Sequence, residues 1–270
     1  MAVIIEKLSG PAPYPGMLSA PLRARLQREI IAVVAETVER RLDFAPAGAV
    51  ERARAAVPDF FALYDQRAVR DNDGGSGFND SLWLYVVARV FAPQAIVESG
   101  VHKGHSTWVL RQACPRAAIH CFDVDLSKLL YHDELAIYFD RDWMEVQLDI
   151  PKDATRLAFF DDHISHARRL SEAKARGFDL LLFDDNFPAH NLYATGGPPV
   201  PTLAMIMDEK LEVEDDIVWT RNAKTYSYRC DAEEISVARG LIERYEVLPE
   251  LSPITRYSPG SGLSVVKLGE

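Results

Sequence analysis

Residues 95–107 of this chain read A-I-V-E-S-G-V-H-K-G-H-S-T and carry most of the information about the fold. An apolar segment leads into the acid Glu98, a glycine loop follows from Gly100 to Gly104, and a helix is expected to start at Ser106. A strand, a tight turn and a helix N-terminus in this order build a ligand cradle in open α/β folds. A site for a bare anion would avoid the acid, whereas a ligand with both an amine and a carboxylate would use it.

Strands and helices alternate on both sides of this stretch. Strands are expected over residues 95–99, 118–123, 145–148, 157–160, 178–183, 217–220, 246–248 and 263–268, and helices over 81–91, 106–113, part of 126–139, 165–176, 201–211 and 231–245. This alternation predicts an α/β fold with a doubly wound, mostly parallel sheet and helices on both faces. The last two strands have no predicted helix between them, which predicts an antiparallel hairpin at one side of the sheet.

The first 70 residues carry helical signals only. Helices are expected there over residues 21–42, 49–56 and 58–67, the first from apolar residues at helical spacing after Pro21. We therefore expect two parts, a helical extension or lid over 1–70 and a ligand-binding domain over 71–270. The polar glycine loop at residues 71–80 is either a flexible connector or a loop that faces the substrate.

The composition narrows the class of protein. The 270 residues include 30 Lys and Arg against 40 Asp and Glu, a net charge of −10, which disfavours nucleic acid and anionic lipid as partners. Three cysteines without a C-x-x-C spacing indicate neither a disulfide framework nor a zinc site. Residues 1–10 do not read as a signal peptide, and no apolar run is long enough to cross a membrane. We expect a soluble, cytoplasmic protein.

The motif E-S-G-V-H-K-G-H-S-T at residues 98–107 resembles the first motif of class I S-adenosylmethionine (SAM)-dependent methyltransferases. Its E-x-G-x-x-x-G-x-S-T form is most similar to the small-molecule branch that includes cephalosporin-hydroxylase-like and sugar O-methyltransferases. The resemblance covers residues 81–270 and is strongest at this motif. It implies a seven-stranded, Rossmann-like methyltransferase fold and methyl transfer to a hydroxyl of a sugar or secondary metabolite. The G-x-G-x-x-G fingerprint of nicotinamide-binding folds is absent.

SAM presents an ammonium, a carboxylate and a sulfonium close together. Glu98 would meet the ammonium directly or through water, and backbone N–H groups of the glycine loop and helix start would meet the carboxylate. The glycines would let the chain approach the ligand without a Cβ atom in the way. The expected cofactor-binding residues are Glu98, Gly100, His102, Gly104, Ser106, Asp123, Asp161, Asp162 and Asp184.

Two strand ends carry acids with more than one interpretation. Asp123 would accept the ribose hydroxyls of an adenosine ligand, whereas its neighbour Asp125 can cap the following helix. The resemblance implies that Asp162 accepts the adenine amino group. One of Asp161 and Asp162 can instead cap the helix that begins near Ser165.

Asp184 and Asp185 follow the most apolar strand, where they can hold a divalent metal, orient a substrate hydroxyl or take its proton. In the enzymes that this chain resembles, acids here bind Mg²⁺ together with an acid or asparagine after the next strand. That acid is missing from this chain, and Asn222 is the residue that can take its place. Asp185 and His190 are the expected catalytic residues, although His190 can equally be a surface histidine. His163 and His166 are attributed to a solvated helix face.

Two other functions stay open from the sequence. The chain can bind SAM without transferring a methyl group. Alternatively, it can be a metal-dependent hydrolase that uses the aspartate cluster, which consists of Asp161, Asp162, Asp184 and Asp185 with nearby histidines. The expected partner is a small-molecule acceptor, and the apolar N-terminal helix suggests a homodimer.

Overall fold

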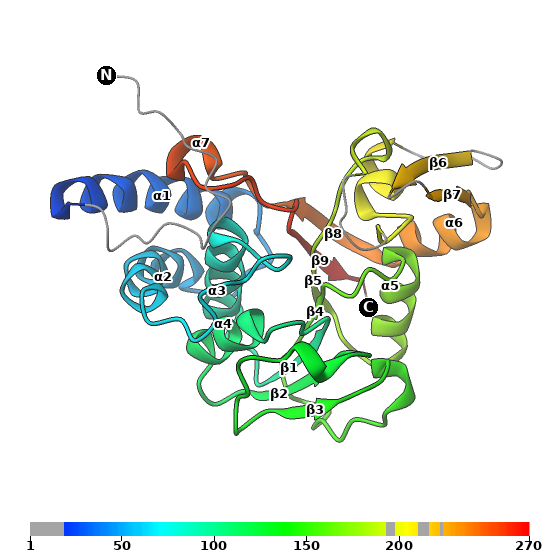
Figure 1. Ribbon diagram of the computed structural model, residues 1–270, viewed down its shortest axis with the longest axis horizontal. Helices are drawn as coiled ribbons and strands as arrows, with labels where there is room; N and C mark the ends of the chain where they lie inside the picture. Colours follow the sequence, from blue (N-terminus) through cyan, green and yellow to red (C-terminus); the bar gives the residue numbers. More distant parts are fainter. Residues whose placement is uncertain (1–18, 193–197, 210–215, 222–223, 270) are drawn as a thin grey trace.

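The computed structural model describes residues 19–192, 198–209, 216–221 and 224–269. Its main feature is a seven-stranded sheet with the strand order β3-β2-β1-β4-β5-β9-β8 (Figure 1). The strands are β1 (Ala95–Ser99), β2 (Ala118–Phe122), β3 (Ile137–Phe139), β4 (Arg156–Phe160), β5 (Leu180–Phe183), β8 (Ile242–Val247) and β9 (Ser264–Leu268). Strands β1 to β5 pair in parallel, and β9 is antiparallel to both β5 and β8. The predicted doubly wound sheet with an antiparallel C-terminal pair is confirmed.

The strand order reverses at β1. Strands β2 and β3 lie on one side of β1, and β4 and β5 lie on the other. In open α/β sheets, ligands bind in the crevice outside the carboxyl ends of the strands at such a reversal. The glycine loop leaves β1 at this point, so the fold places it where a ligand is expected.

Helices cover both faces of the sheet (Figure 1). They are α1 (Ala20–Arg40), α2 (Ala49–Tyr64), α3 (Phe78–Phe91) and α4 (His105–Ala113) on one side, and α5 (His166–Ala175) and α6 (Ala232–Leu241) on the other. Neighbouring residues of β1 point to opposite faces, so Ile96 joins the first core and Val97 the second. Because both faces are covered, the central strands β1, β4 and β5 are mostly apolar and buried.

The N-terminal helices share the core of the sheet domain. α1 packs on α2, α2 on α3 and α3 on α4, and the buried Phe60 and Phe61 contact Phe78 of α3. A single helix, α2, replaces the two helices predicted over 49–56 and 58–67. Pro58 lies inside it, and the buried face continues across the proline. The division at residue 70 stays a prediction.

The segment 126–139, predicted to be partly helical, holds the helical turn η2 (Leu126–Lys128), but its last residues form the edge strand β3, which was not predicted. Two other predicted elements were wrong. The strand expected over 145–148 is absent, and a turn, η3 (Trp143–Glu145), precedes an irregular segment. The helix expected over 231–245 ends at Leu241, because the following residues pair with β9 as strand β8.

The strand predicted over 217–220 exists but lies outside the main sheet. It is β6 (Asp216–Arg221), which pairs with β7 (Lys224–Arg229) in a separate antiparallel hairpin. Most β7 residues are exposed, which does not suit a strand covered on both faces. Strand β6 therefore brings no metal ligand to the carboxyl edge of the sheet, and Asn222 lies outside the described residues.

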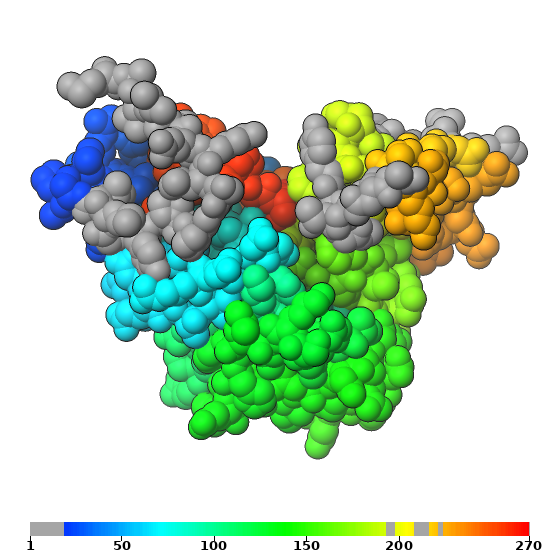
Figure 2. Space-filling view, in the orientation of Figure 1, coloured from blue at the N-terminus to red at the C-terminus, as the bar shows by residue number. Residues whose placement is uncertain are grey.

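The molecular surface is hollowed between two groups of elements (Figure 2). Helices α1 and α7 (Ser252–Thr255) form one side, and the β6–β7 hairpin with the π-helix η5 (Ala204–Glu209) forms the other (Figure 1).

Among the helices that the structure describes, none combines the length and hydrophobicity needed to cross a membrane.

Candidate functional site

The glycine loop after β1 is shaped by the neighbouring chain. Gly100 has a φ of +95°, and a Cβ atom there would lie 2.1 Å from the carbonyl oxygen of Asp161. Gly104 has a φ of +84°, and its Cβ would lie 2.4 Å from the carbonyl oxygen of Tyr131. Both glycines are thus required because neighbouring backbone comes close to them. The sequence had predicted that the close approach of a ligand would require them.

Asp123 holds the glycine loop from the end of β2. Its Oδ2 atom accepts hydrogen bonds from the backbone N–H groups of Val101 (2.9 Å) and His102 (2.8 Å). Its Oδ1 atom accepts from the N–H of Asp125 at 2.9 Å. Asp125 in turn caps η2 through the N–H of Ser127. Asp125 therefore has the capping role that the sequence left open, whereas the ribose contact of Asp123 stays a prediction, and these two loop N–H groups are already engaged.

Glu98 lies buried beneath the same loop. Its Oε2 atom accepts a hydrogen bond of 2.6 Å from the hydroxyl of Thr107, and it is fully shielded from solvent. Its Oε1 atom has no hydrogen-bond partner among the described residues. Burial raises the pKa of Glu98 to about 7. Hydrogen bonds from the hydroxyls of Ser106 and Thr107 lower the pKa, but the effect of burial is larger. An acceptor oxygen without a partner fits a ligand that brings a donor.

Replacing Glu98 with glutamine should flatten the pH dependence of stability. The pKa of Glu98 is about 7 in the fold against an ordinary value of 4.5, so between these values only the unfolded chain releases the proton. Stability therefore falls as pH rises through this window, and the loss is complete above it. We expect wild type to lose about 3 kcal/mol relative to Glu98→Gln between about pH 4 and about pH 8, measured by urea unfolding. Parallel pH profiles for the two proteins would contradict this burial.

The polar loop at residues 71–80 lies against the glycine loop. The Nζ atom of Lys103 donates to the carbonyl oxygens of Asp71 and Asp73, both at 3.1 Å. A Cβ on Gly74 would lie 3.7 Å from the ring of His102. These contacts fix the loop against the glycine loop, and its role as a loop that faces the substrate stays a prediction.

Asp162 is engaged in an ion pair, and the adenine contact that the resemblance implied stays a prediction. Its Oδ2 atom accepts from the hydroxyl of Ser99 (2.5 Å) and lies 2.7 Å from Nη2 of the buried Arg169. Its Oδ1 atom accepts from the N–H of Ile164 at 3.1 Å. The cap of α5 is Ser165, so neither Asp161 nor Asp162 has that role. We assign Asp162 a structural role.

A group of aspartates meets at the carboxyl ends of β4 and β5. The buried Asp184 accepts a hydrogen bond from the hydroxyl of Ser261, and Asp80 of α3 accepts from the N–H of the same serine at 3.2 Å. Burial raises the pKa of Asp80 to about 6. Burial and neighbouring carboxylates hold the pKa values of Asp161 and Asp184 well above their usual range. Asp80 gave no sequence signal, because its partner lies 181 positions away.

Asp185 contacts His163, which the sequence analysis had placed on a solvated helix face. Nδ1 of His163 lies 3.0 Å from Oδ2 of Asp185, and with Asp161 these residues offer three ligand atoms within 4.8 Å of one another. His166, for which the sequence also predicted a solvated helix face, is buried instead, and its Nδ1 atom accepts a hydrogen bond from the N–H of Leu203. Asp161, His163 and Asp185 are thus the described residues that could hold a metal ion, whereas the predicted set of Asp184, Asp185 and Asn222 stays a prediction, because Asn222 lies outside the described residues.

His190 lies exposed on the turn η4 (Ala189–Asn191). The nearby Asn186, which the sequence analysis did not single out, is buried. It accepts from the N–H of Ala204 at 2.6 Å and donates to the hydroxyls of Tyr245 (2.8 Å) and Ser264 (2.7 Å). Asn186 therefore ties the end of β5 to β8, β9 and η5. A catalytic role for His190 stays a prediction.

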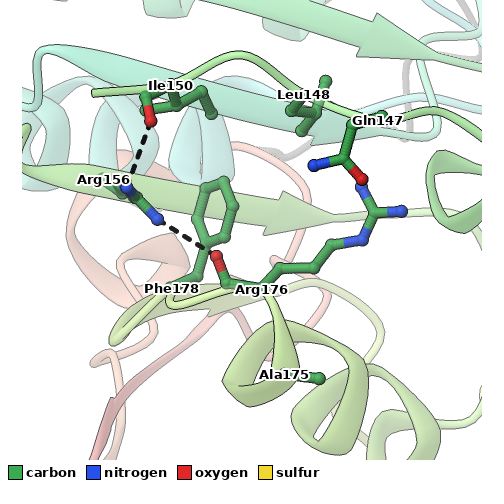
Figure 3. Close-up of a pocket in the computed structure, with 7 residues that line it drawn as sticks. All are labelled: Gln147, Leu148, Ile150, Arg156, Ala175, Arg176 and Phe178. Atoms are coloured by element: carbon green, nitrogen blue, oxygen red, sulfur yellow. Dashed lines mark hydrogen bonds between the residues drawn. The ribbon is translucent and has the colours of Figure 1, made fainter. Parts of the chain in front are cut away.

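A cavity of about 260 Å³ lies at the opposite edge of the sheet (Figure 3). Arg156, at the start of β4, donates hydrogen bonds to the carbonyl oxygens of Ile150 (3.4 Å) and Arg176 (3.0 Å), and Phe178 lies beside it. These contacts join the segment before β4 to the end of α5. The full length of β4 separates this cavity from Asp161, so its arginines belong to the scaffold and not to the aspartate group.

The strand order is that of the seven-stranded, Rossmann-like sheet that the sequence resemblance implied. No protein-family model and no curated protein matches the chain. Among solved structures, it is similar to the SAH-bound methyltransferase PaMTH1 of Podospora anserina, at 14% identity and a TM-score of 0.42, over 94% of this chain and 97% of that one. It is also similar to the O-methyltransferase TomG of Streptomyces achromogenes in complex with SAM, at 11% identity and a TM-score of 0.45, over 90% of this chain and 99% of that one.

A third solved structure, CmcI D160 with Mg-SAM, is similar at 13% identity and a TM-score of 0.42, over 72% of this chain and 73% of that one. With TM-scores below 0.5, these likenesses carry no argument about the function of this chain. We base the function on the side chains of the site itself.

Proposed function

We propose that this protein binds SAM and transfers its methyl group to a hydroxyl of a small molecule, such as a sugar or secondary metabolite. The observation that carries this proposal is the pair of acids on either side of one glycine loop, at the reversal of strand order. Glu98 keeps a buried acceptor oxygen without a partner, and Asp123 lies at the end of the next strand. A ligand with an ammonium and a ribose has a use for both.

The contacts to SAM follow from the donors and acceptors of the loop. Glu98 would accept from the ammonium, directly or through one water. Helix α4 begins after Gly104 without a side-chain cap, so N–H groups of its first turn would meet the carboxylate. A carboxylate offers about four acceptor positions, and Asp123 uses three of them on backbone N–H groups. It could therefore also accept a ribose hydroxyl while still holding the loop.

The acceptor hydroxyl would lie at Asp161 and Asp185. Their carboxylate oxygens suit a divalent cation such as Mg²⁺, which when bound would lower the pKa of the hydroxyl. The two carboxylates would orient the hydroxyl toward the methyl group and offer an oxygen to its proton. Asp184 takes no part in this step, because Ser261 holds its carboxylate.

Calorimetric titration with S-adenosylhomocysteine (SAH), with and without Mg²⁺, tests the proposal. We expect micromolar binding by wild type that Glu98→Gln weakens by about tenfold or more, because a hydrogen bond to a charged group is lost. Since the pKa of Glu98 is about 7, wild-type affinity should also rise as pH increases through neutrality, whereas the variant should not show this rise.

The exposed Glu134 supplies the matched control, because Glu134→Gln makes the same change away from the loop. It should bind SAH like wild type. SAH binding without methyl transfer to any of a panel of hydroxyl compounds would favour a binding protein without catalysis. If SAH does not bind but a metal does, the metal-dependent hydrolase becomes the better account.

A further inference from the structure

Three side chains at the ends of β4 and β5 direct their ligand atoms at one another. Each of Asp161, His163 and Asp185 offers one atom, and these atoms lie within 4.8 Å of one another. Nδ1 of His163 lies 3.0 Å from Oδ2 of Asp185. In an octahedral site with metal–ligand distances of about 2.1 Å, adjacent ligand atoms are about 3.0 Å apart. The spacing is therefore suited to two neighbouring ligands of one cation.

The surrounding contacts leave these three side chains for the cation. Asp162 is held by Ser99 and Arg169, and Asp184 is held by Ser261. In contrast, the carboxylate of Asp161 makes no hydrogen bond or ion pair with another described residue. Asp161 is half-buried beside Asp185, so its carboxylate has lost part of its hydration without gaining a hydrogen bond from a described protein donor. A cation would compensate both carboxylates at once.

We propose that His163 is the third ligand of this cation and makes the site favour a transition ion such as Mn²⁺, Fe²⁺ or Co²⁺ over Mg²⁺. The inference rests on the proposed function, which places a divalent cation at Asp161 and Asp185. Mg²⁺ takes oxygen ligands almost entirely, whereas an imidazole nitrogen suits the transition ions. One nitrogen among two carboxylates therefore decides which ion gains most from the site.

The backbone at His163 sets the choice of variant. His163 has a φ of +58°, in the left-handed region, which asparagine tolerates better than most residues. His163→Asn removes the nitrogen ligand, keeps an oxygen within reach and suits this backbone. His132→Asn is the matched control, because His132 is an exposed histidine beside β3.

The test is calorimetric titration of the purified protein with CoCl₂ and, separately, with MgCl₂, together with the visible absorption of bound Co²⁺. Relative to wild type, His163→Asn should weaken Co²⁺ binding by about tenfold or more and change the Co²⁺ spectrum, while Mg²⁺ affinity changes by less than about threefold. His132→Asn should match wild type for both ions. Asp161→Asn should weaken both ions together.

The proposal is overturned if neither ion binds wild type, or if His163→Asn changes the affinities for Co²⁺ and Mg²⁺ by the same factor. Titration of the same preparations with SAH, without metal, separates this inference from the proposed function. Normal SAH binding without selective loss of Co²⁺ would overturn the role of His163 alone. Absence of SAH binding would overturn the proposed function and leave the metal preference as measured.

Discussion

Gly100→Ala should destabilise the protein by more than about 3 kcal/mol and abolish SAH binding, because the new Cβ meets backbone. That atom would lie 2.1 Å from the carbonyl oxygen and 2.4 Å from the carbonyl carbon of Asp161, which no side-chain rotation can relieve. The φ of +95° adds backbone strain for any residue with a Cβ. Urea unfolding monitored by circular dichroism measures the loss directly.

Gly77→Ala is the matched control for this substitution. Gly77 has a φ of −78°, and a Cβ there would meet nothing within 4 Å. We expect its stability to change by less than about 1 kcal/mol, in either direction. If Gly100→Ala were as stable as Gly77→Ala, the close approach of β1 and β4 at the carboxyl edge would be wrong, and the glycine would have to be explained by the ligand.

Arg169→Leu should be the most destabilising change outside the glycine loop, by about 3–5 kcal/mol, because it leaves three largely solvent-shielded carboxylates without their cation. Arg169 is 1% exposed. Its guanidinium lies 2.7 Å from Asp142, 2.7 Å from Asp162 and 2.5 Å from Glu172. Thermal and urea unfolding should both show the loss. SAH and Co²⁺ binding should weaken as well, since Asp162 holds the end of β4.

The neighbouring Arg168 offers the same substitution on the surface. Its side chain is 53% exposed and pairs with Glu172 at 2.6 Å. Arg168→Leu should therefore cost no more than about 1 kcal/mol, because exposed ion pairs contribute little. Equal losses for the two arginines would show that the carboxylates around Arg169 are not deprived of solvent in the way the structure indicates.

The parts of the fold that the sequence predicted well are those buried on both faces. Strands β1, β2, β4, β5 and β9 were expected at nearly their observed positions, because strands covered on both sides read as apolar runs bounded by turns. Strand β3 has only three residues at the edge of the sheet, and β8 directly follows α6 without a turn signal. Their strand state comes from pairing with distant segments, which periodicity does not record.

The candidate site divides in a similar way. Glu98, Gly100, Gly104 and Asp123 could be singled out because a local strand, loop and helix start carry them. The roles of Asp162 and His163 could not, because they depend on Arg169 and Asp185, which reach them only in the folded chain. A homodimer, a cytoplasmic location and the identity of the acceptor stay predictions.

The sequence by itself determined the doubly wound sheet, the glycine loop at the end of β1 and the acids that follow successive strands, because each is encoded by neighbouring residues. Only the tertiary structure decided what each acid contacts. Arg169 neutralises Asp162, Ser261 holds Asp184, and His163 joins Asp185 beside Asp161. The physical reason is that a carboxylate takes its role from the donors and charges around it, and these come from strands and helices far apart in the chain.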